Sequence, residues 1–274
     1  MSTTTDAPPR VAALPAAAPA RGPLPGSLRR TAALAGAEGR MLRRNRTALF
    51  TALALPVGFV ALVASVAGAR LATPTGAAGA VNLLLGVLLL MVVFYNVLSA
   101  AVARREEGVL QRLRTGEAAD EEVLTAMAVP SAALTVAIAA VFGVAGAVAL
   151  DMPLPGRPLL LALAVVLGCA VMALLALVTA AFTRTLESAQ ITSLPVIAVC
   201  GLGAGLFVPA DALPGALARV AGFTPLAPVV ELVRAGWIGD PSAADVAVWT
   251  ATLLAWVLLG SLVVRARFRW SPRS

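Results

Sequence analysis

Long apolar runs without charges alternate with short polar connectors along most of the chain. Each run is near or above the roughly 20 residues that an α-helix needs to cross a hydrocarbon layer about 30 Å thick. Because unpaired backbone groups are costly in lipid, runs of this length form helices. The pattern predicts an all-α polytopic membrane protein, in which residues 47–265 make one domain of six transmembrane helices. These helices are expected at 47–68, 81–103, 123–150, 159–182, 191–208 and 246–264.

The segments outside this domain are polar or low in complexity. Residues 1–26 are rich in Ala and Pro and hold no apolar stretch long enough to span, which predicts a disordered cytosolic tail. Residues 27–46 carry six arginines among Leu and Ala residues, and Ser27 is a candidate N-cap. We favour an interfacial amphipathic helix here over an extension of the tail, because a basic face suits anionic headgroups. Residues 266–274 form a basic cytosolic tail.

The arginines indicate how the helices are oriented. If the N-terminus is cytosolic, 17 of the 21 basic residues fall in cytosolic segments, and only Arg70, Arg157, Arg219 and Arg234 lie outside. Such a bias predicts that both termini are cytosolic, in a multi-pass protein of the bacterial plasma (inner) membrane. The same bias accounts for the net charge of +7 without a nucleic-acid partner. Only 13% of the residues are charged, about half the usual share in soluble domains.

The residue types present exclude several chemistries. Every basic residue is an arginine, so the chain cannot build a phosphate-binding P-loop or a pyridoxal Schiff base, and without histidine it cannot build a Ser-His-Asp system or a histidine-ligated zinc site. Cys169 and Cys200 lie inside apolar runs and are expected to be buried apolar side chains. We therefore expect no catalytic site, no bound cofactor and no metal. The predicted helices also lack the mid-membrane charge of an ion-coupled carrier.

One row of polar residues lies within the second predicted helix, formed by Asn82, Tyr95, Asn96 and Ser99. Tyr95 and Asn96 each share a helix sector with Ser99. The row could line a substrate path, or it could bind neighbouring helices through hydrogen bonds, which is slightly favoured. In the fifth helix, the spacing of Gly201 and Gly205 suits either packing within one subunit or pairing of two.

The connector after the second helix has the charge order of a short helix. Glu106 and Glu107 come first, Arg112 and Arg114 close the segment, and Gly116 follows. Its apolar residues Val109, Leu110 and Leu113 share one face. This face could rest on the membrane surface or insert into a groove of a cytosolic protein, and the pattern leaves the two equal.

The connector before the last helix is too apolar for an ordinary loop. Prolines, among them Pro209, Pro214 and Pro225, divide it into two short helices, near 215–221 and 227–237. We expect these helices to dip into the outer leaflet and return. Glu231 and Arg234 could form an ion pair there, or remain a weak surface pair.

Three stretches, RREEGVLQRLRTG, FVPADALPG and TPLAPVVELVRA, stand in this order on the six-helix pattern. With them the chain after Arg40 resembles the type-2 ABC exporter permeases, the family that includes the daunorubicin-type drug-resistance permeases. The resemblance implies a pair of permease subunits, expected as a homodimer, and two cytosolic ABC ATPase subunits that hold ATP and Mg. It makes residues 27–46 a connecting helix and 209–237 re-entrant outer helices. It also favours docking for the connector, whose ATPase-docking coupling helix would hold Glu106, Glu107, Gly108, Val109, Leu110, Arg112, Leu113 and Arg114.

The resemblance implies export, and the missing lysine independently requires a partner to supply the energy. The expected cargo is a hydrophobic or amphipathic small molecule, such as a drug, a lipid or a natural product, taken from among the membrane lipids. Two alternatives remain: a membrane-embedded enzyme of lipid metabolism, and a non-transporting immunity or scaffold protein.

Overall fold

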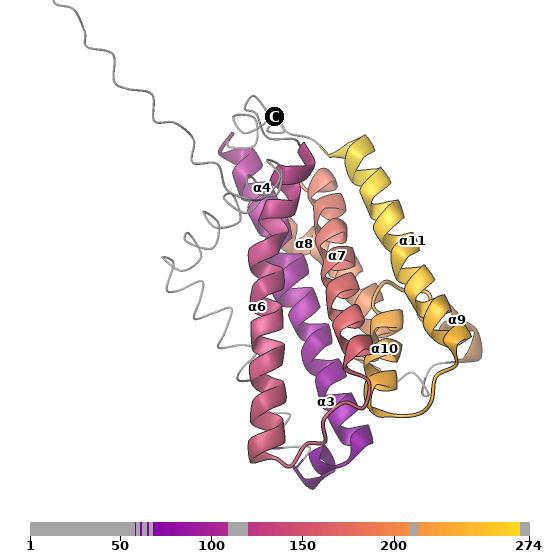
Figure 1. The fold of residues 1–274 in the computed structure, drawn as a ribbon. Helices are drawn as coiled ribbons and strands as arrows, with labels where there is room; N and C mark the ends of the chain where they lie inside the picture. Colours follow the sequence, from indigo (N-terminus) through magenta and orange to yellow (C-terminus); the bar gives the residue numbers. More distant parts are fainter. Residues whose placement is uncertain are drawn as a thin grey trace, which may run out of the picture.

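A computed structural model describes residues 58, 61, 65, 68–108, 120–208, 212 and 214–268. Every regular element among them is a helix, and five helices are long and apolar enough to cross a membrane. They run alternately up and down in one bundle (Figure 1). The predicted tail 1–26, the predicted interfacial helix 27–46, most of the first predicted span and residues 269–274 lie outside the described part.

The centre of the bundle is one continuous helical stack, Pro74–Glu106. Thr73 caps it by accepting a hydrogen bond from the backbone N–H of Gly76 at 3.1 Å, and Pro74 occupies the first turn. The most apolar stretch of this stack is 72% buried, against 11–44% for the other four spans. It consists of α3 (Pro74–Val87), the π-helix η2 (Leu88–Tyr95) and α4 (Asn96–Glu106), preceded by the short 3-10 helix η1 (Gly68–Ala72).

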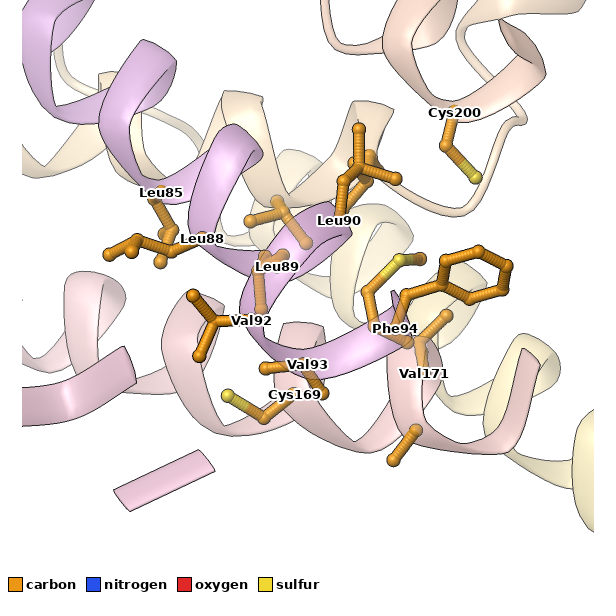
Figure 2. Packing of buried hydrophobic residues seen from close by; sticks show 14 of the residues in the cluster. Leu85, Leu88, Leu89, Leu90, Val92, Val93, Phe94, Cys169, Val171 and Cys200 are labelled. Atoms are coloured by element: carbon orange, nitrogen blue, oxygen red, sulfur yellow. The ribbon is translucent and has the colours of Figure 1, made fainter. Parts of the chain in front are cut away.

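The π-helix lies at the densest part of the core. Its residues Leu88, Leu89, Val93 and Phe94 are wholly buried, and they lie among side chains of the neighbouring helices, such as Val171 (Figure 2). A π-helix of eight residues is rare, and such segments concentrate at functional sites.

Of the four further long helices, α6, α7 and α8 pack against this stack, and α11 packs against the outer side of α7. Residues 106–108, the start of α6, the α7–α8 turn and the end of α11 gather at one end of the bundle, which we call the connector end (Figure 1). The start of α3, the α6–α7 connection and the start of α11 gather at the other, the distal end (Figure 1). The long helices are α6 (Asp120–Ala149), α7 (Pro158–Phe182), α8 (Leu186–Gly203) and α11 (Ala243–Arg267).

Helices occupy five of the six predicted spans, and two of these helices have clearly shifted ends. The second begins at Pro74 rather than at residue 81, because Thr73 and Pro74 start a helix in a stretch of small residues. The fifth runs five residues earlier than predicted at both ends. A reciprocal capping box between Thr185 and Ser188 starts it, in spite of the polar Glu187 and Gln190.

Two short helices complete the distal end: α9 (Gly215–Ala221) and α10 (Ala227–Trp237). Both match their predicted ranges. At 1.5 Å per residue α10 is about 16 Å long, too short to cross a membrane. It packs against α3, α7 and α11, and its apolar residues Val229, Leu232 and Val233 are buried.

Glycines set the closest helix contacts. A Cβ at Gly260 of α11 would lie 2.9 Å from Cβ of Leu174 on α7, and one at Gly168 would lie 2.8 Å from Leu89. Within α8, a Cβ at Gly201 would meet the ring of Phe207 at 2.3 Å, and one at Gly203 would meet Thr224. Contacts inside one subunit therefore fill the space beside Gly201 and Gly203, whereas Gly205 lies beyond the end of α8 with φ +68°.

The contact at Gly260 generates a prediction. Gly260→Ala should lower the free energy of unfolding by about 1–3 kcal/mol, because α11 must move away from Leu174. Gly143→Ala on α6 is the matched control, since nothing lies within 4 Å of its added Cβ and Ala favours a helix. Thermal unfolding in detergent measures both variants. Equal melting temperatures would contradict the close α7–α11 contact.

Candidate functional site

The stack ends at residues 106–108, where the connector leaves the bundle; we call these residues the connector root. Glu106 is the last residue of α4, and the C-cap Glu107 donates its backbone N–H to Ala103 at 3.0 Å. Gly108 follows with φ +68°, the left-handed conformation that commonly ends helices. Glu106 therefore belongs to α4, and a docking helix can begin only after Gly108. Five residues of the predicted docking helix lie outside the described part: Val109, Leu110, Arg112, Leu113 and Arg114.

Arg105 lies on the buried side of α4 and is 1% exposed. Its guanidinium donates hydrogen bonds to the backbone carbonyls of Ala180 at 2.7 Å, of Thr183, and of Arg184 at 3.3 Å. These acceptors belong to the end of α7, where carbonyls lack helical partners and the helix dipole is negative. Arg105 thereby satisfies carbonyls of a helix 75 residues further along the chain.

The α7–α8 turn next to Arg105 is held by side-chain hydroxyls. Thr183 is fully buried and donates to the carbonyl of Thr179 at 2.8 Å. Its hydroxyl also lies 2.8 Å from that of Thr192 on α8. Together with the capping box of α8, these bonds make α4, the turn and α8 one connected unit.

A groove opens at the connector end between α6, α7 and α11. It has a volume of about 600 Å³ and mainly apolar walls, and an ion pair between Arg265 and Glu121, 2.7 Å long, lies at its rim. Both side chains are about two-thirds exposed, so the pair adds little stability. A second cavity of about 600 Å³ lies toward the distal end, among apolar residues of α3, α6 and α7 beside Trp237. Both cavities could accept apolar chains.

The polar row predicted on the second helix is partly brought together. Tyr95, Asn96 and Ser99 are neighbours, whereas Asn82 lies about 20 Å away along the axis. Tyr95, Asn96 and Ser99 are half-buried and make no side-chain hydrogen bond within the described ranges. Hydrogen bonds to the described helices therefore do not account for these three side chains. Asn82 is also half-buried, and its Oδ1 is a buried atom without a partner there.

Half-buried positions recur every four residues along the stack. The wider turn of η2 offsets part of the drift that a four-residue spacing shows on an α-helix, so these positions stay on one side of the stack. Tyr95 and Ser99 stand on it, and Asn96 stands beside it. We call these positions the open stripe: Leu83, Val87, Met91, Tyr95, Ser99 and Ala103.

At the distal end the α6–α7 connection is tied to α10. The indole N–H of Trp237 donates to the carbonyl of Pro153 at 2.7 Å. The backbone N–H of Arg157 donates to Gly236 at 3.1 Å, and its guanidinium donates to the carbonyl of Gly239 at 2.7 Å and pairs with Asp240. These bonds satisfy carbonyls at the end of α10 and in the connection to α11.

The other residues predicted at the distal end make fewer side-chain interactions among the described residues. Glu231 and Arg234 do not pair: Glu231 is half-buried, Arg234 is exposed, and neither makes an ion pair or side-chain hydrogen bond among the described residues. Pro214 directly precedes α9 and Pro225 lies in the buried turn before α10, whereas Pro209 lies outside the described part.

The described residues offer no group of three His, Cys, Asp or Glu side chains that could hold a metal ion. Cys169 on α7 and Cys200 on α8 are free, buried thiols. The chemistry of the described part therefore consists of charges at the helix ends and of neutral polar groups along the stack.

Sequence reasoning missed Arg105 and Trp237 as structural anchors. A local signal existed for Arg105, since it follows the buried Leu98 and Ala101 at helical spacing. No pattern near Trp237 identifies Pro153, 84 residues away, as its acceptor.

Comparison with known families gives one match. The family model described as ABC-2 type transporter matches residues 30–237. This range covers the connector root, Arg105, the open stripe, α9 and α10. A search of curated proteins finds no match.

The bond at Trp237 generates a prediction. Trp237→Phe should lower the free energy of unfolding by about 0.5–1.5 kcal/mol, because the carbonyl of Pro153 loses its donor. Trp249→Phe on α11 is the control, since its indole makes no hydrogen bond within the described part. Thermal unfolding in detergent compares the two variants. A loss as large for Trp249→Phe would show that ring size, and not the hydrogen bond, sets the cost.

Proposed function

Because the chain belongs to the ABC-2 type transporter family, we propose that it is the permease of an exporter driven by separate ATPase subunits. As a member of this family it is a multi-pass transport subunit rather than a catalytic one. The observation that carries the proposal is the family match over residues 30–237, on a bundle of long apolar helices with a capped connector root.

The positions of the charged residues in the spans support an energy source that lies outside this chain. In the five described spans, Asp, Glu and Arg residues occur only in the terminal turns, such as Arg104 and Arg105 of α4 and Asp245 of α11. Ion-driven carriers usually keep such a group at mid-membrane. Since the sequence holds no lysine for a P-loop, ATP and Mg²⁺ belong to a partner, of which we propose two copies.

We assign the connector end to the cytosol and the distal end to the outside. The connector end holds the described residues Arg104, Arg105, Arg184, Arg265 and Arg267, and the arginine-rich segments at both chain ends fit the same assignment. The ATPase then docks on the segment that follows Gly108, and α9 with α10 forms the re-entrant outer pair. Residues 27–46 lie at the cytosolic surface as the interfacial helix, and the membrane is the bacterial inner membrane.

The open stripe supports an apolar or amphipathic cargo. It presents Met91, Tyr95 and Ser99, and Asn96 stands beside it. Neutral hydrogen-bonding groups among apolar ones suit a drug, a lipid or a natural product better than an ion. We place the path along this stripe, with a second copy of the chain closing its far side.

The test needs the chain together with an ATPase that carries a P-loop. Inside-out vesicles that hold both proteins should accumulate amphipathic fluorescent dyes in the presence of ATP and Mg²⁺. Vesicles whose ATPase has lost its P-loop lysine should not accumulate them. ATP-driven accumulation that persists without this chain would overturn the proposal.

The left-handed conformation of Gly108 generates a prediction for the connector root. Gly108→Val should lower the amount of ATPase that co-purifies by about tenfold, because a branched residue at φ +68° costs roughly 1–2 kcal/mol and redirects the segment that follows. Gly108→Asn should retain most of the ATPase, since Asn tolerates this conformation. Equal loss in both variants would contradict a role for the left-handed turn.

A further inference from the structure

Arg105 stands apart from the other arginines of the connector end. Arg265 and Arg267 on α11 are exposed, as expected for arginines at a membrane boundary that extend toward water. Arg105 instead turns into the protein and is the largest fully buried side chain among the described residues. Burial of a guanidinium is costly unless its donors are satisfied, so this orientation needs a compensating interaction.

The compensation comes from the end of α7. Two nitrogens of one guanidinium reach the carbonyls of Ala180, Thr183 and Arg184, which lie where α7 turns into α8. A planar fork can serve these acceptors together, whereas the ammonium of a lysine is a single point charge. The negative end of the α7 dipole adds to the attraction.

The place of Arg105 in the chain gives this bond a mechanical consequence. It lies three residues before Gly108, where the connector leaves the bundle. A movement of the connector root reaches α4 directly and reaches the α7–α8 turn through Arg105. The hydrogen bond between the hydroxyls of Thr183 and Thr192 carries it on to α8.

We propose that Arg105 is the positioning residue that couples the ATPase-docking connector to the α7–α8 turn. The proposal rests on the proposed function. Without the guanidinium the docked ATPase would still bind and hydrolyse ATP, but its movement would reach the α7–α8 turn only through the packing of α4 against α7 and α8. Arg105 thus determines how much transport each hydrolysed ATP produces.

The experiment uses the full chain with its ATPase in proteoliposomes and measures ATP hydrolysis and dye transport together. Arg105→Gln should lower the ratio of transport to hydrolysis by about tenfold, within the range typical of a lost coupling between sites, while ATPase co-purification stays unchanged. Arg105→Lys keeps the charge and should recover part of this ratio. Arg267→Gln, an exposed arginine of the same end, should leave the ratio as in the wild type.

A second readout does not depend on cargo. Hydrogen–deuterium exchange of residues 180–188 should change when the wild-type complex binds a non-hydrolysable ATP analogue, and this change should be smaller in Arg105→Lys. If Arg105→Gln fails to accumulate in the membrane, Arg105→Lys decides the test.

The outcomes separate the two proposals. A normal transport-to-hydrolysis ratio in Arg105→Lys, with a normal exchange response, would reduce Arg105 to a purely structural anchor and overturn the inference. A wild-type chain that binds no ATPase would instead overturn the proposed function.

Discussion

The hydrocarbon layer offers no water to backbone groups, so every helix end within or near it must find its partners inside the protein. In this molecule long side chains with nitrogen donors serve the carbonyls at these ends. Arg105 serves the end of α7, Arg157 serves the connection between α10 and α11, and Trp237 and Trp256 serve loop carbonyls at Pro153 and Phe223. Other helix ends, such as those of α6 and α8, are instead closed by backbone N–H groups of the residues that follow.

Burial is distributed unevenly. The stack Pro74–Glu106 is surrounded by α6, α7 and α10, whereas α8 and α11 bury only 22% and 11% of their most apolar stretches. The open stripe therefore belongs to the most buried of the described spans, whereas α11 lies away from the stack and packs mainly against α7.

The sequence predicted the positions of the helices well, but it predicted poorly which distant residues form hydrogen bonds at the helix ends. Proline and glycine punctuation placed α9 and α10 correctly, because these residues act locally on the backbone. The start of α3 was missed since small residues after Thr73 carry little hydropathy, although the cap and Pro74 were visible. The stripe could not be derived, because the π-helix that brings its positions closer together has no signal in the sequence pattern. The acceptors of Arg105 lie 75 and more residues away, beyond any local pattern.

The two ends of the bundle are linked by α7. Its last turn receives the bonds of Arg105 from α4, and the residue before its first turn, Arg157, binds Gly236 at the end of α10. Between them α7 is a helix of 25 residues without an internal proline, about 37 Å long. Gly168 lets Leu89 and Val229 approach its middle closely, so it cannot slide freely against the stack or α10. If a displacement is delivered at its connector end, as the proposed coupling requires, α10 at the distal end would have to follow α7 or lose its bond to Arg157. Under the proposed function, coupling across the membrane would then need no flexible relay, only one long helix held by an arginine near each end.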